Sequence, residues 1–537
     1  MLKKMLFVAL ALPLVASLGA AVQAEPVQGG TFRYGMTTNP RGMFNSILNT
    51  EVYDGWVIDV VYDGLIEIDA ELQPQPNLAE RWEISEDGLS ITFYLREGVT
   101  FHDGVELTAK DVEYTYMTIL HPEYTGVRFG NFRVLDGAEE YRDGETDFVP
   151  GIEVIDDYTI RFSTRETFAP LLVQFNYGIL PSHLLADIPV GELEEADFNA
   201  NPIGTGPFKF VEFVTDQHVI LDANEDYFRG RPNIDTLVFQ KVADDAVPIY
   251  LQQNRVDFIQ ISPEHYPQVS NLNFVDIYVH EALSYSYIAF NLRQDRFADV
   301  NVRQAMKYGF DRETYVEIIL EGFGIVANAP MPQASWAFSD EGINDYAYNP
   351  DLAAEMLAEA GWAAGSDGVL EKDGMRLEFE LLVPDGTRTQ EQMALLFQQN
   401  MEDIGVKVNL QFMDFSSAVD RVDAREFDMF TMGWSLSVDP DPFGIWHSTV
   451  PWNDPGFYND RSDELIEMGR RVTDMAERQE IYAEWQQVIN HELPYIFLNY
   501  AVVIAAVNER VQGLDTDPGP YGPLVARQLL RSIWLEQ

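Results

Sequence analysis

A ten-residue loop near position 440 combines residue types that suit a binding site for a small molecule. Residues 433–442 read GWSLSVDPDP. Gly433 lets a ligand backbone approach closely, and Trp434 offers a flat apolar face with one N–H donor. Asp439 and Asp441 each precede a proline, which favours an extended loop that can aim carboxylates inward. The alternative is a core tryptophan followed by two turn-forming aspartates.

Several kinds of chemistry are excluded by what the sequence lacks. With no cysteine there is no disulfide, no thiol nucleophile, no thiolate metal site and no lipid anchor on a cysteine. No serine-hydrolase, zinc-protease or phosphate-loop signature occurs, and the glycine-rich segment 204–207 lacks the phosphate-loop lysine. The eight histidines form no pair at helical or hairpin ligand spacing. We therefore expect no enzyme activity, no cofactor and no metal site.

The length and charge of the chain favour a large, acidic protein with more than one core. It has 537 residues, of which 46% are hydrophobic, enough for two or three cores. The net charge is −52, and removing residues 1–24, with two lysines and no acids, gives −52 − 2 = −54. Such a surface repels nucleic acid and anionic lipid. We interpret the acids as a solvated surface; an acidic cleft that selects cations is the alternative.

The first 24 residues have the pattern of a secretory signal peptide. Lys3 and Lys4 precede an apolar run from Met5 to Ala20, and Val22-Gln23-Ala24 offers a small-residue cleavage site before Glu25. The apolar run is shorter than the ~20 residues needed to span a bilayer. Because no cysteine follows for a lipid anchor, we expect a mature protein in the periplasm of a Gram-negative cell.

Strand and helix patterns alternate along the chain, which predicts α/β layers. The clearest unit has a strand at Glu378–Val383, a helix at Gln390–Ile404 and a strand at Val406–Phe412. A strand, a helix and a strand of these lengths form a βαβ unit, so the two strands should be parallel.

Two helix starts can be read from capping residues. Asn349 before Pro350 and Asp351 predicts a capped start, with Gly361 ending that helix. Asn301, with a glutamine three residues later, resembles a capping box.

An ordered set of motifs resembles one family, the solute-binding proteins of bacterial ABC importers that take oligopeptides, dipeptides, nickel or oligosaccharides. The most informative stretch is 92–116, in which a strand leads to a Phe-His-Asp-Gly turn and then to a helix. The other motifs follow in family order over nearly the whole mature chain: VYDGL at 61–65, NLAERW at 77–82, PIGTGPF at 202–208, NVRQA at 301–305 and GW at 433–434.

The resemblance implies a two-lobed periplasmic-binding-protein fold of the Venus-flytrap kind, type II, with an extra domain inserted in lobe one. The chain would cross between the lobes twice. The expected limits are residues 1–24 for the signal peptide, 25–67, 196–283 and 499–537 for lobe I, 68–195 for the extra domain and 284–498 for lobe II.

The resemblance also implies site residues, with departures. It places Gly433, Trp434 and Ser435 on the wall of the interlobe cleft. Where peptide-binding relatives pair the ligand ammonium with an aspartate, this chain has Ser437, and Asp439 or Asp441 would have to replace it. Thr431 stands where some members have a carboxylate-binding arginine. These losses favour longer peptides held by their backbones, or a ligand without charged ends.

Two further positions come from the resemblance. An arginine that helps hold the peptide matches Arg421 after a one-residue shift. Thr38 and Asn39, after the first strand, would reach the opposite wall of the cleft and offer hydrogen bonds. The alternative for Thr38 and Asn39 is an ordinary turn before Pro40.

The sequence thus predicts a monomeric periplasmic receptor that closes about a hinge on its ligand and delivers it to ABC permease subunits in the inner membrane. Peptides are the expected ligand, oligopeptides more than dipeptides. An oligosaccharide receptor of the same fold is the alternative, and a periplasmic hydrolase a more distant one.

Overall fold

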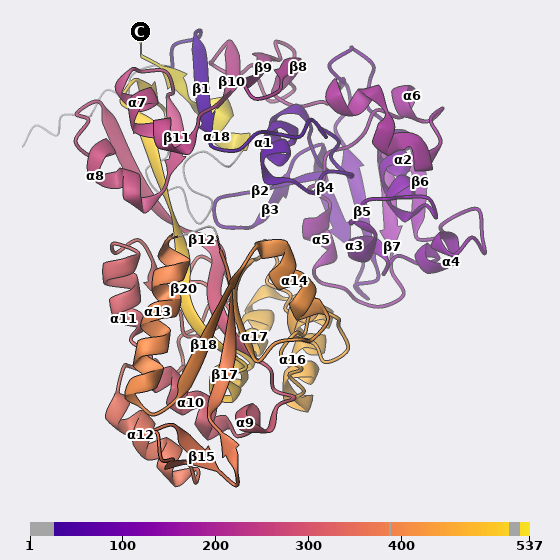
Figure 1. The fold of residues 1–537 in the computed structure, drawn as a ribbon. Helices are drawn as coiled ribbons and strands as arrows, with labels where there is room; N and C mark the ends of the chain where they lie inside the picture. The colour runs from indigo at the N-terminus through magenta and orange to yellow at the C-terminus, as the bar shows by residue number, and fades with distance from the viewer. Residues whose placement is uncertain (1–25, 386–387, 515–526, 537) are drawn as a thin grey trace, which may run out of the picture.

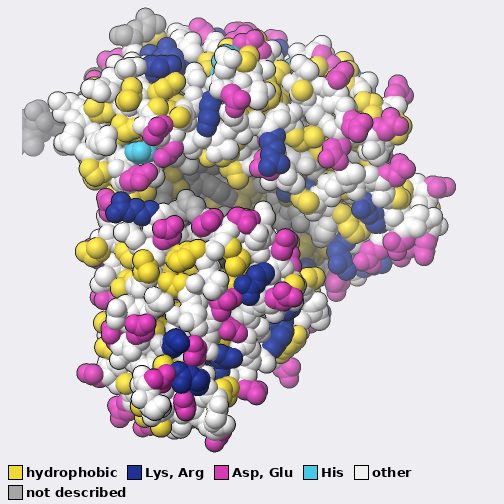
Figure 2. Space-filling model, viewed as in Figure 1, with side chains coloured by type: hydrophobic (Ala, Val, Ile, Leu, Met, Phe, Trp, Pro, Cys, Tyr) yellow, Lys and Arg dark blue, Asp and Glu magenta, His cyan; other side chains and the backbone are white. Residues whose placement is uncertain are grey.

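The computed structural model describes residues 26–385, 388–514 and 527–536, and the expected signal peptide lies outside them. Two α/β lobes lie one above the other in Figure 1, with a third body beside the upper lobe. A groove separates the upper and lower halves in the space-filling view of Figure 2. The two-lobed periplasmic-binding-protein fold is therefore confirmed.

One mixed sheet of eleven strands runs through both lobes. Its order is β18 (Lys407–Met413), β17 (Glu378–Pro384), β19 (Met429–Ser435), β12 (Val275–Phe290), β20 (Tyr495–Asn508), β11 (Phe258–Ile261), β1 (Thr31–Met36), β10 (Thr236–Lys241), β9 (His218–Ala223) and β8 (Phe208–Val214), with β13 (Ile325–Val326) paired to β20.

Two long antiparallel strands, β12 and β20, join the lobes. They pair from Val275↔Asn508 in the upper lobe to Ala289↔Tyr495 in the lower one. The register shifts between Glu281 and Tyr285, where the ladder passes from one lobe to the other. The regular ladder of the two connecting strands is therefore interrupted between the lobes.

Lobe I is built around the N-terminal strand. β1 pairs in parallel with β10 on one side and β11 on the other, and β11 pairs antiparallel with β20. Near the other end of the chain, Arg510 donates to the carbonyl of Thr31 at 3.2 Å. The helices of this lobe are α1 (Val52–Val61), α7 (Val247–Gln252), α8 (Tyr266–Val269) and α18 (Arg527–Ser532).

The extra domain has its own antiparallel sheet with helices packed on it. The sheet order is β4 (Ala79–Ile84), β5 (Ser90–Leu95), β7 (Thr159–Ser163) and β6 (Ile152–Asp156). Its helices are α2 (Ala109–Leu120), α3 (Phe129–Phe132), α4 (Ala138–Arg142), α5 (Leu171–Gln174) and α6 (Ser182–Leu185). α2 begins with a capping box in which the Asp111 carboxylate accepts from the Thr108 N–H at 2.8 Å.

Lobe II contains the predicted βαβ unit. β17 and β18 are parallel and are joined by α13 (Arg388–Asp403), so this prediction is confirmed. The other helices are α9 (Asp295–Ala298), α10 (Val300–Tyr308), α11 (Arg312–Thr314), α12 (Pro350–Glu359), α14 (Phe415–Asp423), α15 (Phe443–Trp446), α16 (Asp460–Arg471) and α17 (Met475–Glu492). Short pairings complete the fold: β2 (Ile66–Ile68) with β3 (Pro74–Pro76), β14 (Ala363–Ala364) with β15 (Leu370–Lys372) and β16 (Met375–Arg376), and β21 (Val511–Gln512) with β22 (Trp534–Leu535).

One predicted helix cap is confirmed and one is wrong. Asn349 accepts from the Leu352 N–H at 3.0 Å at the start of α12. The start of α10 is capped by Asp299, whose carboxylate accepts from Asn301 N–H at 2.9 Å. Asn301 lies inside the first turn because the charged oxygen of Asp299, two residues earlier, is the stronger acceptor for the free N–H groups.

Four of the motifs that carried the family resemblance, at 61–65, 77–82, 92–116 and 202–208, meet where lobe I joins the extra domain. Asp63 is fully buried and accepts from Asn77, Thr205 and Tyr227 at 3.1 Å each. His102 hydrogen-bonds with the carbonyl of Gly206 at 3.0 Å, and burial lowers the pKa of His102 to about 4. These four motifs therefore hold lobe I and the extra domain together.

No helix within the described residues is long and apolar enough to cross a membrane.

Candidate functional site

The predicted loop starts where β19 ends, at the edge of lobe II that faces lobe I. Gly433, Trp434 and Ser435 pair with Ser286, Tyr285 and Ser284 of β12 respectively. Residues of β12 before this point pair with β20 inside lobe I, so the carboxyl end of β19 points toward that lobe. The structure thus brings all three predicted residues to the interlobe side.

One edge of this segment has no strand beside it. β17 pairs with β19 only at Leu381↔Met429 and Leu382↔Phe430. Beyond Phe430, the described part of the chain supplies a neighbour for β19 on the β12 side alone. A strand edge of this kind offers backbone N–H and C=O groups that an extended peptide can pair with.

An apolar pocket of about 220 Å³ lies beside Trp434. The indole rings of Trp434 and Trp452 are 6.0 Å apart between centroids, at 43° to each other. Trp452 is 58% exposed, which is unusual for so large an apolar side chain. The remaining apolar lining residues are Pro330, Met331, Leu436, Pro440, Pro442, Ile445, Trp446 and Trp485.

Asp439 lines the pocket, but its charge is compensated inside the protein. Both carboxylate oxygens accept from the Arg478 guanidinium, at 2.7 and 2.8 Å, and the two side chains are 5% and 3% exposed. Burial alone would lower the pKa of Arg478, but the hydrogen bonds that its guanidinium donates to Asp439 raise this pKa above its usual value. This geometry gives Asp439 a partner before any ligand arrives.

Asp441 is held in a similar way by a different arginine. Its carboxylate lies 3.2 Å from Arg470 of α16 and accepts from the Phe443 N–H at 3.1 Å. Burial raises the pKa of Asp441 to about 6, helped by the charge of Asp439 and opposed by Arg470. Both aspartates therefore shape the loop that leads into α15, which is the role of turn-forming residues.

Arg421 is not brought to this loop. It lies in the last turn of α14 and pairs with Glu380 of β17 at 2.8 Å. The N–H of Glu380 donates to Asp428, at the opposite end of β19 from Ser435. With a rise of ~3.3 Å per residue, Asp428 and Ser435 are roughly 20 Å apart along β19. Arg421 therefore packs beside the start of β17, away from the loop at 433–442.

Thr38 and Asn39 lie at the edge of lobe I that faces lobe II. They follow β1, in which Gly35 pairs with Ile259 of β11. Two residues further along β11, Ile261 pairs with Ile504 where β20 enters from lobe II. Thr38 is exposed, whereas the Asn39 side chain donates to Asp216. Thr38 thus stays available to a ligand, and Asn39 has an internal partner.

The extra domain also touches lobe II, on the side away from the connecting strands (Figure 1). The N–H of Ala169 donates to the carbonyl of Arg470 at 2.8 Å, and the Arg470 guanidinium lies 4.8 Å from the Phe168 ring centre. A second cavity of about 140 Å³ lies along this contact, and Asp439 lines both cavities.

Sequence reasoning missed Trp452, Met331 and the serines of β12 as parts of this wall. Trp452 lies in a Pro-Trp-Asn-Asp-Pro run, and a tryptophan among turn residues is a readable signal of an exposed ring. Ser284 and Ser286 carry no such signal, since only strand pairing places them next to Ser435 and Gly433.

Two lobes joined by two strands, with a groove between them, define the class of solute-binding receptors that enclose a ligand. The profile of the bacterial extracellular solute-binding proteins, family 5, matches residues 73–455. The chain belongs to that family, whose members bind peptides or small molecules, work with ABC permeases and are receptors rather than enzymes.

Individual relatives agree with this assignment. Oligopeptide-binding protein AppA of Bacillus subtilis (strain 168) is 33% identical over 503 residues, covering 92% of this chain and 90% of the relative. The structure of that AppA with a nonapeptide has a TM-score of 0.77 at 32% identity and covers 96% of this chain and 100% of its own. Heme-binding protein A of Haemophilus influenzae (strain ATCC 51907 / DSM 11121 / KW20 / Rd) is 30% identical over 530 residues, covering 94% and 93%.

Proposed function

We propose that this protein is the periplasmic receptor of an ABC importer for peptides, and that it takes oligopeptides in preference to dipeptides. The observation that carries the proposal is the unpaired edge of β19 beyond Phe430, next to the pocket of Trp434 and Trp452. An extended peptide would pair its backbone with this edge and place an apolar side chain between the indole rings.

The charges around the loop favour a peptide held by its backbone. Asp439 and Asp441 are both committed to arginines, Ser437 donates to the Asp439 carbonyl at 2.5 Å, and Thr431 donates to Tyr287 at 2.9 Å. None of these four groups offers an unpaired charge to a ligand terminus. A dipeptide depends on its two charged ends, whereas a longer peptide gains affinity from each additional backbone pair.

The binding cycle would be hinge closure. Ligand would bind first to one lobe, and contacts from the other would then favour the closed form by bending at β12 and β20. We place the domain limits at residues 67/68, 195/196, 283/284 and 498/499, the last two within these strands. The receptor would be a monomer, exported by a cleaved signal peptide, that presents the closed form to its permease.

A second candidate is a receptor of the same fold for an oligosaccharide or another flat, uncharged ligand. Trp434 and the 58% exposed Trp452 favour it, because paired aromatic faces stack on planar or ring-shaped ligands. One relative is named for haem binding, which shows that the family is not confined to peptides.

The test is native mass spectrometry of the protein purified from its periplasm, followed by denaturation and identification of whatever is released. Peptides of several lengths and sequences are the expected result. Release of a sugar or another non-peptide would overturn the peptide assignment. Incubation of the protein with the same peptides, followed by mass analysis, separates a receptor from a hydrolase, because a receptor returns them uncut.

A comparison of free and N-acetylated forms of one released peptide by calorimetry tests backbone-led recognition. Similar affinities are expected, since Ser437 has no charge and the carboxylates of Asp439 and Asp441 are already paired with arginines. A hundredfold loss on acetylation, about 2.7 kcal/mol, would show that another acid holds the peptide terminus.

A further inference from the structure

Three side chains that can bind a metal converge at the edge of lobe I that faces lobe II. Asp244 begins a short turn, η3 (Asp244–Ala246), after β10, and Glu264 and His265 lie in another, η4 (Pro263–His265), after β11. β10 and β11 both lie parallel to β1, so these turns share an edge with Thr38. Ligand sites in α/β sheets form beyond the carboxyl ends of such strands.

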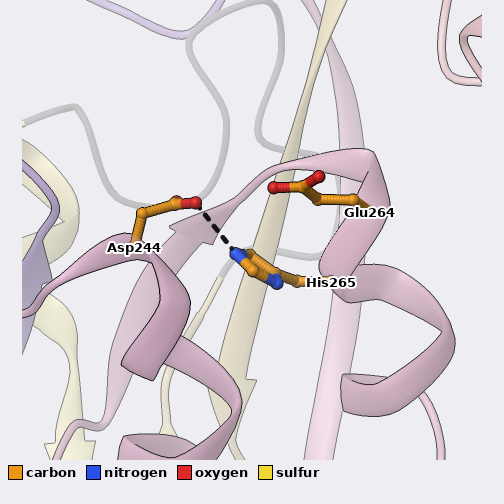
Figure 3. Close-up of side chains that lie close together, drawn as sticks. All are labelled: Asp244, Glu264 and His265. Atoms are coloured by element: carbon orange, nitrogen blue, oxygen red, sulfur yellow. Dashed lines mark hydrogen bonds and ion pairs between the residues drawn. The ribbon is translucent and has the colours of Figure 1, made fainter. Parts of the chain in front are cut away.

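The three side chains point at a common centre. His265 Nε2 lies 3.1 Å from Asp244 Oδ2, and the Glu264 carboxylate faces both groups (Figure 3). The donor atoms all lie within 4.8 Å of one another. His265 is buried, which fixes the imidazole, while the two acids are exposed and can adjust.

Within the described residues, no cation of the protein other than His265 is paired with the two acids of this cluster. Apart from its bond to His265, Asp244 has no ion-pair partner among the described residues, and Glu264 has none either. Two carboxylates held this close repel each other unless a proton or a cation lies between them. Repulsion would turn an exposed glutamate away into water, so its inward position favours a bound cation.

We propose that Asp244, Glu264 and His265 bind one divalent transition-metal ion of the zinc class. One imidazole nitrogen and two carboxylate oxygens form a donor set suited to zinc, whose bonds to N and O ligands are about 2.0–2.2 Å. The donor atoms already lie within 4.8 Å of one another, and Glu264 is exposed, so its side chain is free to approach a bound ion. Three protein ligands leave a fourth position open to water or to a donor group on the imported ligand.

Sequence spacing did not reveal this site, because Asp244 is twenty positions before Glu264. The two turns become neighbours only through the sheet, in which β1 lies between β10 and β11. The cluster is separate from the loop at 433–442, which belongs to lobe II, so it does not depend on the proposed peptide site.

The test is titration of the mature protein, first stripped with EDTA, with zinc chloride by calorimetry. One zinc ion with a micromolar Kd is expected, together with a rise in melting temperature. Glu264→Gln and His265→Ala should each weaken zinc binding at least tenfold. His218→Ala is the matched control, because His218 also pairs with a carboxylate, Glu212 at 3.0 Å, and should leave the affinity unchanged.

Cobalt(II) absorption gives a second readout, since cobalt(II) held in a four-coordinate protein site has strong visible d–d bands, which Glu264→Gln and His265→Ala should diminish. Glu264→Gln is the decisive variant: Glu264 is exposed and no described contact is lost, so the protein remains folded. Zinc affinity unchanged in Glu264→Gln and His265→Ala, or an absence of stoichiometric binding to the wild type, would overturn the proposal.

Discussion

The ion pair between Asp439 and Arg478 provides the sharpest test of how the loop at 433–442 works. Asp439→Ala removes two hydrogen bonds of 2.7 and 2.8 Å and leaves a guanidinium that is 3% exposed. Removing one partner of a buried pair costs about 3–5 kcal/mol, since the remaining charge has lost its compensation. Among the described residues, Arg478 then retains the Gly469 carbonyl and the Tyr482 hydroxyl as acceptors, at 2.8 and 3.2 Å.

We therefore expect Asp439→Ala to lower the free energy of unfolding by about 3–5 kcal/mol, measured by urea denaturation without ligand. The double variant Asp439→Leu/Arg478→Met is the matched control, and it should regain a large part of the loss because no charge is left buried. Asp439→Ala should change the affinity for a free-amine peptide and the affinity for its N-acetylated form by the same factor.

The opposite pattern would refute the reasoning. If Asp439→Ala left stability unchanged but weakened only the free-amine peptide, the carboxylate would be the ammonium partner that the sequence comparison first suggested. An equally unstable double variant would show that packing, and not charge, holds the loop.

Other parts of the molecule give three further predictions. Trp434→Ala and Trp452→Ala should each weaken ligand binding by about 1–3 kcal/mol in calorimetry, whereas lost melting temperature with unchanged affinity would make them packing residues. Because the folded pKa of Asp441 is about 6, above its ordinary 3.8, the folded state binds its proton more tightly. The stabilisation that Asp441 provides should thus fall as pH rises from about 4 to 6. Over that window, the free energy of unfolding of the wild type, measured by urea denaturation, should fall by up to about 3 kcal/mol relative to that of Asp441→Asn. A difference between the two proteins that does not change with pH would contradict this prediction. Melting temperature should rise with sodium chloride, since the expected mature charge of −54 repels itself and salt screens charges beyond about 8–10 Å; flat curves would mean that local pairs already balance the acids.

Local patterns predicted the fold well because they report local physics. The β17–α13–β18 unit and the start of α12 followed from hydrophobic period and capping chemistry alone. Gly433, Trp434 and Ser435 were placed on the interlobe side by the family resemblance, and the structure has them at the end of β19.

What the sequence could not supply is the pairing of residues that lie far apart in the chain. Arg478 follows Asp439 by 39 positions, and nothing in the loop sequence announces that an arginine will neutralise it. The pairing of Arg421 with Glu380, 41 positions earlier, is equally invisible in the local sequence. The cluster of Asp244 and His265 likewise depends on sheet order and not on spacing.

The central place of β1 has a consequence for how the chain is made. β1 is synthesised first, yet its neighbours are β10 and β11, more than 190 residues later, and Arg510 reaches back to Thr31 across 479 positions. Contacts this distant form slowly and cannot form until the far partner exists. Lobe I therefore cannot be completed until nearly the whole chain has been synthesised.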